Sequence, residues 1–439
     1  MSHLINRPEY LTQLIQNKDI DLVKIVTGIR RCGKSSLLDL FHQYLSTNNV
    51  PDTHIIHMNL ESLRYRNLTN YLSFYDYVSA LIPATGKTYL IFDELQVVEH
   101  WEKAVESFRL DFDVDIYITG SNAYLLSTEF STLLSGRYVE IRMLPLSFKE
   151  FLMANGENML VDYIDKGNRN LGAFEARLTD YLKKYMIIGG MPAVVTEWLG
   201  SKDYNKVNRI QQELIAAYQK DFSKHAPKYM VEKIRYVWNS IPSQLAKENK
   251  KFVYGLVREG ARAREYEDAI MWLSDAGEII RTNNVSKPDI PISAYADLKS
   301  FKVFLLDVGL LRAMSKISPK VILEGSRIFE EFKGALTEQY VCQELQNFTE
   351  TLETNYYWSS SATAEVDFLI SDGLDVYPLE AKAGVTMNAK SLKLYREKYS
   401  PKWSVRTSLL PYERNNSYKT INIPLYMLFV LDKELKAES

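Results

Sequence analysis

A short stretch near the start of the chain has the residue types and spacing of a phosphate-binding loop. Residues 23–41 read VKIVTGIRRCGKSSLLDLF, where the spacing GxxxxGK[ST] follows a run of strand-forming residues and precedes apolar residues at helical spacing. Such a loop points backbone N–H groups at an anion, and the helix dipole adds to the attraction. We expect Lys34 to contact the β- and γ-phosphates of ATP and the Ser35 hydroxyl to bind Mg²⁺. The residues expected to bind the nucleotide are Gly28, Ile29, Arg30, Arg31, Cys32, Gly33, Lys34, Ser35 and Ser36.

Two acids at the end of a later strand would complete this chemistry. Residues 88–96 read TYLIFDELQ, so an apolar strand ends on Asp93 and Glu94. In P-loop ATPases a carboxylate in this place holds Mg²⁺, and an adjacent glutamate can orient the attacking water. The alternative is a strand that merely ends in solvated acids. With the phosphate loop upstream, we predict that Asp93 binds the Mg²⁺ of ATP and that Glu94 is catalytic.

Two more polar residues follow the next strands. In TGSNAYLLS, Asn122 comes directly after an apolar strand, where its side chain could touch the γ-phosphate or the catalytic water. A helix N-cap is the alternative for this residue and for Ser121. In LLSGRYVEI, Arg137 precedes a strand, and its guanidinium could face a γ-phosphate in the same subunit or in a neighbouring one. The alternative is an ordinary surface arginine.

A second group of chemically capable residues lies near the end of the chain. Residues 364–384 read AEVDFLISDGLDVYPLEAKAG, which predicts two strands joined by an Asp-Gly turn. Glu380 and Lys382 are two apart on one strand and point to one side, which Asp367 can reach from the other strand. A helix upstream could present Glu338 to the same place. The alternative is a structural ion pair between Glu380 and Lys382 beside Asp367.

This arrangement resembles the site of PD-(D/E)xK nucleases. In such sites two carboxylates bind a divalent metal, and the lysine stabilises charge or helps to deprotonate water. The resemblance implies a restriction-endonuclease-like α/β domain with a second divalent metal, in addition to the Mg²⁺ of ATP. Resemblance in fold does not establish cleavage.

The middle of the chain has a local excess of positive charge. Residues 228–316 contain fifteen Lys or Arg against eleven Asp or Glu. Two helical patterns, VEKIRYVWNSIPSQLA and REYEDAIMWLSDAGEII, precede two short strands, which suggests a winged-helix module. A solvated face of mixed charge and a protein-contact surface are the alternatives to DNA binding. The candidate DNA contacts are Lys250, Lys251, Arg258, Arg262 and Arg264.

The elements that would position the nucleotide site alternate between strands and helices. Strand patterns recur as LVKIVTG, THIIHMNLE, TYLIFDE, VDIYITGSN and RYVEIRML, with helical stretches between most of them. This alternation predicts an α/β fold with a mostly parallel sheet covered by helices on both faces. Ligands of such sheets bind at the carboxyl ends of the strands, where the loop and Asp93 would both lie.

Composition narrows the class of protein. The chain has 439 residues, of which 46% are hydrophobic and 25% charged, so an ordinary globular protein of several domains is expected. The formal net charge of −2 gives no overall attraction to nucleic acid, so any such surface must be local. Two distant cysteines, Cys32 and Cys342, match no metal spacing and favour a reducing compartment. With no apolar run of about 20 residues, we expect a cytoplasmic protein without a membrane partner.

Taken together, the motifs resemble the prokaryotic AAA+ superfamily ATPases that carry a C-terminal domain of unassigned role. The resemblance rests on GIRRCGKSSLL, LIFDELQ, TGSNAYLLS and SGRYVEIRMLPLSFKEF, with GGMP at 189–192 and FLLDVGLL at 304–311. It implies Asn122 as a sensor and Arg137 as an arginine finger. The expected domains are an AAA+ ATPase domain (1–155), a helical region (156–227), a winged-helix-like domain (228–318) and a nuclease-like domain (319–439).

The expected function is ATP hydrolysis to ADP and phosphate, coupled to the winged-helix and nuclease-like modules and directed at DNA. One alternative is an ATP-gated DNA nuclease. Another is a switch without turnover, in which bound ATP recruits a protein partner. A homo-oligomer would be needed if Arg137 acts on a neighbouring subunit.

Overall fold

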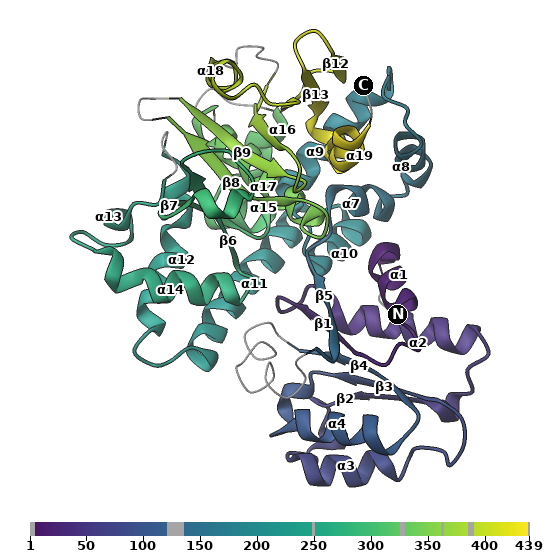
Figure 1. Ribbon diagram of the computed structural model, residues 1–439. Coiled ribbons are helices and arrows are strands. Elements are labelled where there is room, and N and C mark those ends of the chain that lie inside the picture. Colours follow the sequence, from purple (N-terminus) through teal and green to yellow (C-terminus); the bar gives the residue numbers. More distant parts are fainter. Residues whose placement is uncertain are drawn as a thin grey trace. The chain divides into compact units, whose positions relative to one another are not determined.

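The strands expected in the N-terminal part of the chain form one parallel sheet (Figure 1). Its order is β2-β3-β4-β1-β5, and every pairing within it is parallel. The strands are β1 (Val23–Gly28), β2 (Ile55–Asn59), β3 (Thr88–Asp93), β4 (Val114–Thr119) and β5 (Tyr138–Met143). β1 and β3 are buried along their whole length, as expected for central strands covered on both faces. The predicted parallel α/β sheet is confirmed.

This sheet belongs to the first of two compact units in the computed structural model. The first unit contains Met1–Leu144 together with Asp275–Gly277, and the second contains Pro145–Ser274 and Glu278–Ser439. The structure describes residues 5–120, 136–247, 251–324, 330–360, 364–384 and 390–437. Within these ranges no helix is long and apolar enough to cross a membrane.

Helices cover both faces of the first sheet (Figure 1). They are α1 (Pro8–Gln16), α2 (Lys34–Thr47), α3 (Tyr71–Ser79) and α4 (Trp101–Asp111). On one face, Phe74 of α3 and Phe108 of α4 pack in one core cluster with Phe92 of β3. On the other face, Phe41 of α2 contacts Tyr117 of β4 with ring centroids 4.3 Å apart. The burial on both faces fixes the sheet, and with it the positions of the strand ends.

The second unit is built on a mixed sheet of order β12-β13-β11-β10-β9-β8-β6-β7. Its strands are β6 (Ile279–Val285), β7 (Ala296–Leu305), β8 (Glu353–Ser359), β9 (Glu365–Ser371), β10 (Val376–Ala381), β11 (Ser404–Ser408), β12 (Glu413–Asn415) and β13 (Thr420–Pro424). β9 and β10 pair antiparallel around a turn in which Gly373 has φ 83°, a left-handed value that glycine adopts readily. The predicted hairpin is therefore confirmed.

The two strands expected to form a wing belong to this same sheet. β6 and β7 pair antiparallel as a wing would, but β6 also pairs in parallel with β8, through Asn283↔Tyr356 and Val285↔Trp358. The sheet therefore continues across the boundary expected at 318/319. The sequence patterns identified both strands of the hairpin but not the pairing of β6 with β8, because that partner is distant in the sequence.

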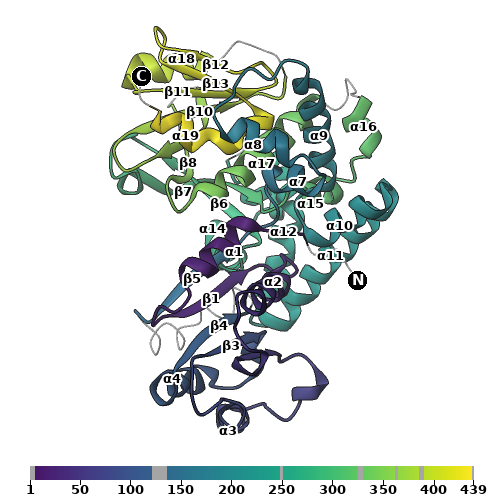
Figure 2. The ribbon, with the colours of Figure 1, turned by 90° about the vertical axis from the view of Figure 1, so that its right-hand side faces the viewer.

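Helices surround the second sheet. They are α7 (Phe148–Ala154), α8 (Asn158–Asp165), α9 (Phe174–Ile188), α10 (Pro192–Ser201), α11 (Tyr204–His225), α12 (Val231–Leu245), α13 (Tyr254–Val257), α14 (Ala263–Asp275), α15 (Val308–Met314), α16 (Pro319–Glu324), α17 (Glu330–Leu345), α18 (Lys390–Tyr399) and α19 (Leu431–Lys436). Leu392 and Tyr395 of α18 pack on Trp358 and Leu369 of the sheet. Figure 2 shows α18, β12 and β13 at the same end of the second unit.

Two glycine motifs that are far apart in the sequence meet inside the second unit. Asp307 caps α15 by accepting a hydrogen bond from the Leu310 N–H (2.9 Å), and it also accepts one from the Gly190 N–H (2.6 Å). A Cβ atom on Gly190 would lie 2.0 Å from the carbonyl oxygen of Leu146. The glycine is required there because the backbones approach too closely for any side chain.

Candidate nucleotide site and a second acidic cluster

The phosphate-binding loop lies between β1 and α2, as predicted. Gly28 and Gly33 have φ values of 144° and 102°, which favour glycine. A Cβ atom on Gly28 would lie 2.4 Å from the Met143 carbonyl oxygen and 2.8 Å from the Cys32 sulfur. Cys32 is fully buried and fills the space beneath the loop. These contacts hold the loop close to β5 and leave room for glycine alone at its first position.

Lys34 begins α2 and folds back over the loop. Its Nζ donates hydrogen bonds to the carbonyl oxygens of Gly28 (3.0 Å) and Ile29 (3.1 Å), and the residue is only 4% exposed. The next residue, Ser35, is exposed on the first turn of the helix. The arrangement places a cation, a hydroxyl and a helix N-terminus beside one loop, where an anion is stabilised.

Asp93 ends β3 at the same edge of the sheet. The parallel registers Val26↔Thr119 and Phe92↔Ile118 align the carboxyl ends of β1, β4 and β3. Asp93 is buried, and its carboxylate accepts hydrogen bonds from the Thr119 hydroxyl and from Asn59 Nδ2 (2.9 Å). Among the described residues, no lysine, arginine or histidine forms an ion pair with this carboxylate. Both of its hydrogen-bond donors are neutral groups, the Thr119 hydroxyl and the Asn59 amide.

Glu94 turns away from the strand in the left-handed conformation (φ 56°). Its N–H donates to the Thr119 hydroxyl (3.0 Å), and its side chain accepts a hydrogen bond from the Gln96 amide. Thr119 therefore holds both acids. Sequence reasoning missed Thr119 and Asn59, although each ends a predicted strand on a polar residue, and this signal could have identified them.

Arg137 lies at the opposite edge of the sheet. Its carbonyl oxygen accepts a hydrogen bond from the Val23 N–H (2.9 Å), and β1 and β5 run parallel from Val23↔Tyr138 to Gly28↔Met143. Five residues of strand separate that end from the loop, about 17 Å. The side chain forms an ion pair with Glu106 of α4. Within the described residues, the Arg137 side chain is thus held by α4, at the edge of the sheet opposite the loop. Asn122 lies outside the described residues.

The four residues of the expected nuclease-like site come together in the second unit. Lys382 Nζ lies 2.5 Å from Glu380 Oε1, and the Ala381 N–H donates to Asp367 Oδ2 (2.8 Å). Burial raises the pKa of Asp367 well above its usual range, and the nearby charges of Glu338 and Glu380 raise it further. Burial also raises the pKa of Glu380, against the effect of Lys382. Placing carboxylates this close together in the interior disfavours their charged forms.

These four residues form an acidic cluster with two further residues, Lys302 and Glu365, which sequence reasoning missed. Lys302 of β7 is fully buried, and its Nζ lies 2.5 Å from Glu365 Oε1 and 3.7 Å from Glu338 Oε2. A lysine within the apolar strand pattern SFKVFLL is unusual and could have indicated a buried ion pair.

The carboxylates of the acidic cluster are held by cations and by a backbone N–H. Within the ranges that the structure describes, no group of three or more His, Cys, Asp or Glu side chains is arranged to hold a metal ion. Its carboxylates instead contact Lys302, Lys382 and a backbone N–H. The second divalent metal that the nuclease resemblance implied thus has no support among the described residues.

The candidate DNA contacts of the middle region lie around α13 and α14. Lys251, Arg258, Arg262 and Arg264 are exposed, and Lys250 lies outside the described residues. Exposed glutamates alternate with them, and Glu265 accepts a hydrogen bond from the Arg262 N–H (3.1 Å). The charges on this surface are therefore mixed.

Three models of known protein families match separate parts of the chain. Residues 21–152 match the family model described as AAA domain. Residues 179–321 and 333–426 match two families described as Domain of unknown function (DUF8612) and Domain of unknown function (DUF4143).

Two relatives are described as uncharacterized proteins. One, from Haemophilus influenzae, is 43% identical over 194 residues, which are 44% of this chain and 45% of the relative. The chain thus spans less than half the length of that relative. The other, from Methanocaldococcus jannaschii, is 28% identical over 374 residues, which are 84% of this chain and 75% of the relative.

Similar solved structures include a Walker-type ATPase of Pyrococcus abyssi, with a TM-score of 0.45 and 15% identity over 71% of this chain and 95% of that one. The ORC1 protein of Aeropyrum pernix in complex with DNA has a TM-score of 0.29 and 12% identity over 72% and 94%. The AAA family match, the parallel sheet and the loop between β1 and α2 together define residues 21–152 as an AAA-type P-loop ATPase domain.

Proposed function

We propose that the AAA-type domain binds ATP with Mg²⁺ and hydrolyses it to ADP and phosphate. The observation that carries this proposal is the position of Lys34, whose ammonium group is held over the loop by the carbonyls of Gly28 and Ile29. On nucleotide binding the ammonium exchanges these carbonyls for β- and γ-phosphate oxygens. Loop N–H groups and the N-terminus of α2 supply the remaining stabilisation.

The metal of the nucleotide has two expected protein contacts. Mg²⁺ is bound by one or two protein oxygens together with phosphate oxygens, and it neutralises charge that develops on the phosphates. The Ser35 hydroxyl and the buried Asp93 carboxylate fit this requirement, since Asp93 has only neutral hydrogen-bond donors around it. Glu94 positions the attacking water and accepts its proton, while Thr119 fixes Glu94 through its backbone N–H.

Phosphate release from ATP tests the proposal. The purified chain is expected to turn over ATP when Mg²⁺ is present, and Lys34→Ala is expected to lower the rate at least about 100-fold. Lys103→Ala is the matched control, because Lys103 lies in α4 of the same unit beside the Tyr71 ring. Equal rates for Lys34→Ala and wild type would overturn the proposal.

Arg137 acts on a neighbouring subunit in this proposal. Arg137 directly precedes β5, at the amino-terminal edge of the sheet. This position supports the proposal that it serves the nucleotide site of another subunit. A homo-oligomer would supply it, and such an arginine contributes strongly to stabilising the transition-state charge. Asn122 remains the expected sensor of the γ-phosphate.

The nucleotide state is proposed to control the C-terminal module, which acts on DNA. The residues Glu338, Asp367, Glu380 and Lys382 support a restriction-endonuclease-like fold, and α12 to α14 followed by the β6–β7 hairpin support a winged-helix arrangement. The exposed basic residues Lys251, Arg258, Arg262 and Arg264 are the proposed DNA contacts of that arrangement.

An ATP-gated nuclease is a second candidate function, favoured by the convergence of Lys382 and Glu380 beside Asp367. Lys382→Ala would then abolish DNA cleavage and leave ATP turnover intact. Uncut DNA with the wild-type chain, with and without ATP, would remove this candidate.

A nucleotide-dependent switch is the third candidate. It would bind ATP tightly without turnover and recruit a protein partner. If the chain binds nucleotide but releases no phosphate, although Glu94 is present, that result would favour the switch.

A further inference from the structure

A large open groove lies on the C-terminal module, between α18 and the strands β11, β12 and β13. Its volume is about 1010 Å³, near the upper end of the range for small-molecule pockets. Five of its lining residues are Lys or Arg and two are Glu. The basic residues come from both walls: Lys390, Lys393 and Arg396 from α18, and Arg406 and Lys419 from the strand side.

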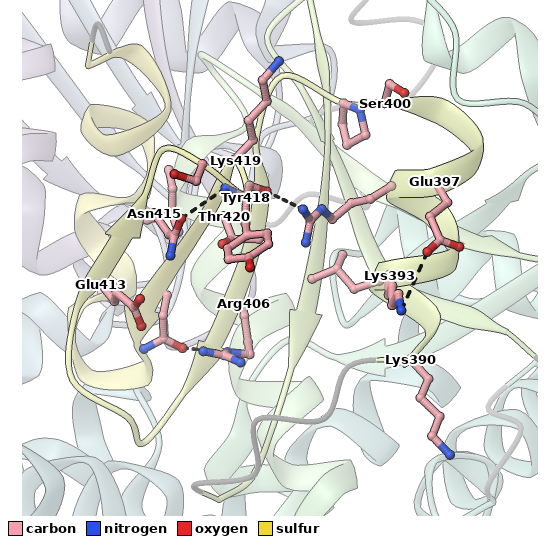
Figure 3. A pocket seen from close by; sticks show the side chains of 16 residues that line it. Lys390, Lys393, Glu397, Ser400, Arg406, Glu413, Asn415, Tyr418, Lys419 and Thr420 are labelled. Atoms are coloured by element: carbon pink, nitrogen blue, oxygen red, sulfur yellow. Dashed lines mark hydrogen bonds and ion pairs between the residues drawn. The ribbon is translucent and has the colours of Figure 1, made fainter.

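The cations of the groove are mostly available to a ligand. Lys393 is 77% exposed, and its nearest acid, Glu397, lies 3.9 Å away at i+4, an exposed pair that contributes little. Lys390 is exposed and forms no ion pair among the described residues. Figure 3 shows Lys390 and Lys393 along the helical wall and Lys419 on the opposite wall. Lysines on two facing walls match a polyanion, whose charges repeat along its length.

An aromatic ring stands in the groove among these charges. Tyr418 lines the groove and is 64% exposed. Its backbone is fixed, because the Tyr418 N–H donates to Asn415 Oδ1 (3.1 Å) and its carbonyl oxygen accepts a hydrogen bond from Arg396 (Figure 3). An exposed ring on a backbone held in this way is a surface on which an unpaired base can stack.

The groove and the acidic cluster share one face of the sheet. Glu380 is in register with Arg406 on the neighbouring parallel strand, and Arg406 is in register with Asn422 on the next one. Register partners on adjacent strands project from the same face. The backbones of Arg406 and Glu380 therefore lie one strand spacing, about 4.8 Å, apart.

We propose that this groove binds single-stranded nucleic acid, with its phosphates on Lys390, Lys393 and Lys419 and a base stacked on Tyr418. The bound strand continues along the sheet face toward Glu380 and Asp367. This inference rests on the proposed role of the C-terminal module and deepens it, because it names a contact surface separate from the mixed-charge surface near α14.

An acidic protein segment would also be attracted by the lysines, but it offers no flat base for Tyr418. A nucleic-acid duplex offers no free base either, since its paired bases are stacked on one another and not on a protein ring. The exposed tyrosine thus favours a single strand over the alternatives.

Binding of labelled dT₂₀ and rU₂₀ to the full-length chain, measured by fluorescence anisotropy with EDTA and without nucleotide, tests the proposal. The double variant Lys390→Glu/Lys393→Glu is expected to raise the Kd at least about 10-fold and to make log Kd less dependent on log salt, by about 0.7 for each phosphate that the variant no longer neutralises. Tyr418→Ala is expected to raise the Kd for single strands by about 5-fold or more and to leave binding of a 20-base-pair duplex unchanged.

The matched control is Lys320→Glu. Lys320 is 76% exposed on α16 and has a glutamate at i+4 at the same 3.9 Å as Lys393, but it lies outside the groove. No binding of either oligonucleotide by wild type, or an equal loss with Lys320→Glu and the groove variants, would overturn the proposal. Preference for a polyglutamate peptide over dT₂₀ would also overturn it. Because no nucleotide is present, failure of ATP hydrolysis would not affect these readings.

Discussion

Asp307 and Gly190, separated by more than a hundred residues of sequence, are joined by a hydrogen bond of 2.6 Å between the carboxylate and the backbone N–H. A second backbone contact supports it, since the Leu146 N–H donates to the Gly190 carbonyl oxygen (2.7 Å). The two sequence motifs GGMP and FLLDVGLL thus form one buried junction between α9, α10 and α15. Their role in this junction is structural, and they lie in a different unit from the nucleotide site.

Substitution of Gly190 by alanine is expected to destabilise the second unit by about 3 kcal/mol or more. The new Cβ would lie 2.0 Å from the Leu146 carbonyl oxygen, so the backbones must separate and the bond to Asp307 must weaken. Chemical denaturation followed by tryptophan fluorescence measures the change. Gly200→Ala in α10 is the control, because a Cβ there has no neighbour within 4 Å and alanine favours a helix. Equal stabilities of the two variants would contradict the claim that the close backbone contact at Gly190 stabilises the second unit.

The pH dependence of stability is expected to change with Glu344→Gln. Burial raises the pKa of Glu344 to about 8, while its carboxyl oxygen accepts a hydrogen bond from the Phe148 N–H (2.9 Å). An acid whose pKa is raised by folding stabilises the protein fully below its unfolded pKa, and this contribution is lost as pH rises to the folded value. Between pH 4.5 and 8 the wild type should lose about 4 kcal/mol through this group, and the glutamine variant should not.

The free energy of unfolding of both proteins, measured from pH 4.5 to 9, tests this expectation. The difference between the variant and the wild type should grow in favour of the variant up to about pH 8 and then stay constant. Glu353→Gln, at an exposed position that begins β8, should give a curve parallel to wild type. A parallel curve for Glu344→Gln would show that the carboxyl group is not held neutral.

Mixing two inactive variants tests whether Arg137 serves a neighbouring subunit. Lys34→Ala and Arg137→Ala should each hydrolyse ATP slowly when alone. After mixing in equal amounts, about a quarter of the interfaces would combine an intact loop with an intact arginine, so about a quarter of the wild-type rate should return. Activity no greater than the sum of the separate variants would argue against action between subunits.

Thr119→Val is expected to slow ATP hydrolysis by about 10- to 100-fold with little change in ATP affinity. The substitution removes the hydroxyl that donates to Asp93 and accepts from the Glu94 N–H, while keeping the shape of the side chain. Thr119→Ser should restore the rate. Thr88→Val is the control, since the Thr88 hydroxyl is buried at the other end of β3 and has no hydrogen-bond partner among the described residues. Equal rates in the two valine variants would disprove the positioning role.

The nucleotide site was largely predictable from sequence because its main parts are local. The loop from Gly28 to Ser35 is continuous, and Asp93 and Glu94 end one strong strand pattern. Thr119 and Asn59 were not predicted, because their roles depend on which strand lies beside β3. The edge at which Arg137 lies follows from its place directly before β5 in a parallel sheet.

The second unit was predicted less completely for the same reason. The β9–β10 hairpin is local and was recognised from its Asp-Gly turn. The parallel pairing of β6 with β8 joins segments that have β7, α15, α16 and α17 between them, and no local pattern encodes it. Lys302 was overlooked because its carboxylate partners come from β9 and α17.

The pairing of β6 with β8 has a consequence for how the chain folds during synthesis. The β6–β7 hairpin leaves the ribosome first, with one edge of β6 lacking the partner it has in the final sheet. At about 5–20 residues per second, the stretch between Val285 and Glu353 takes several seconds to emerge. During that delay the open edge of an Ile- and Val-containing strand can pair with other chains, so a chaperone that covers this edge would protect the nascent protein.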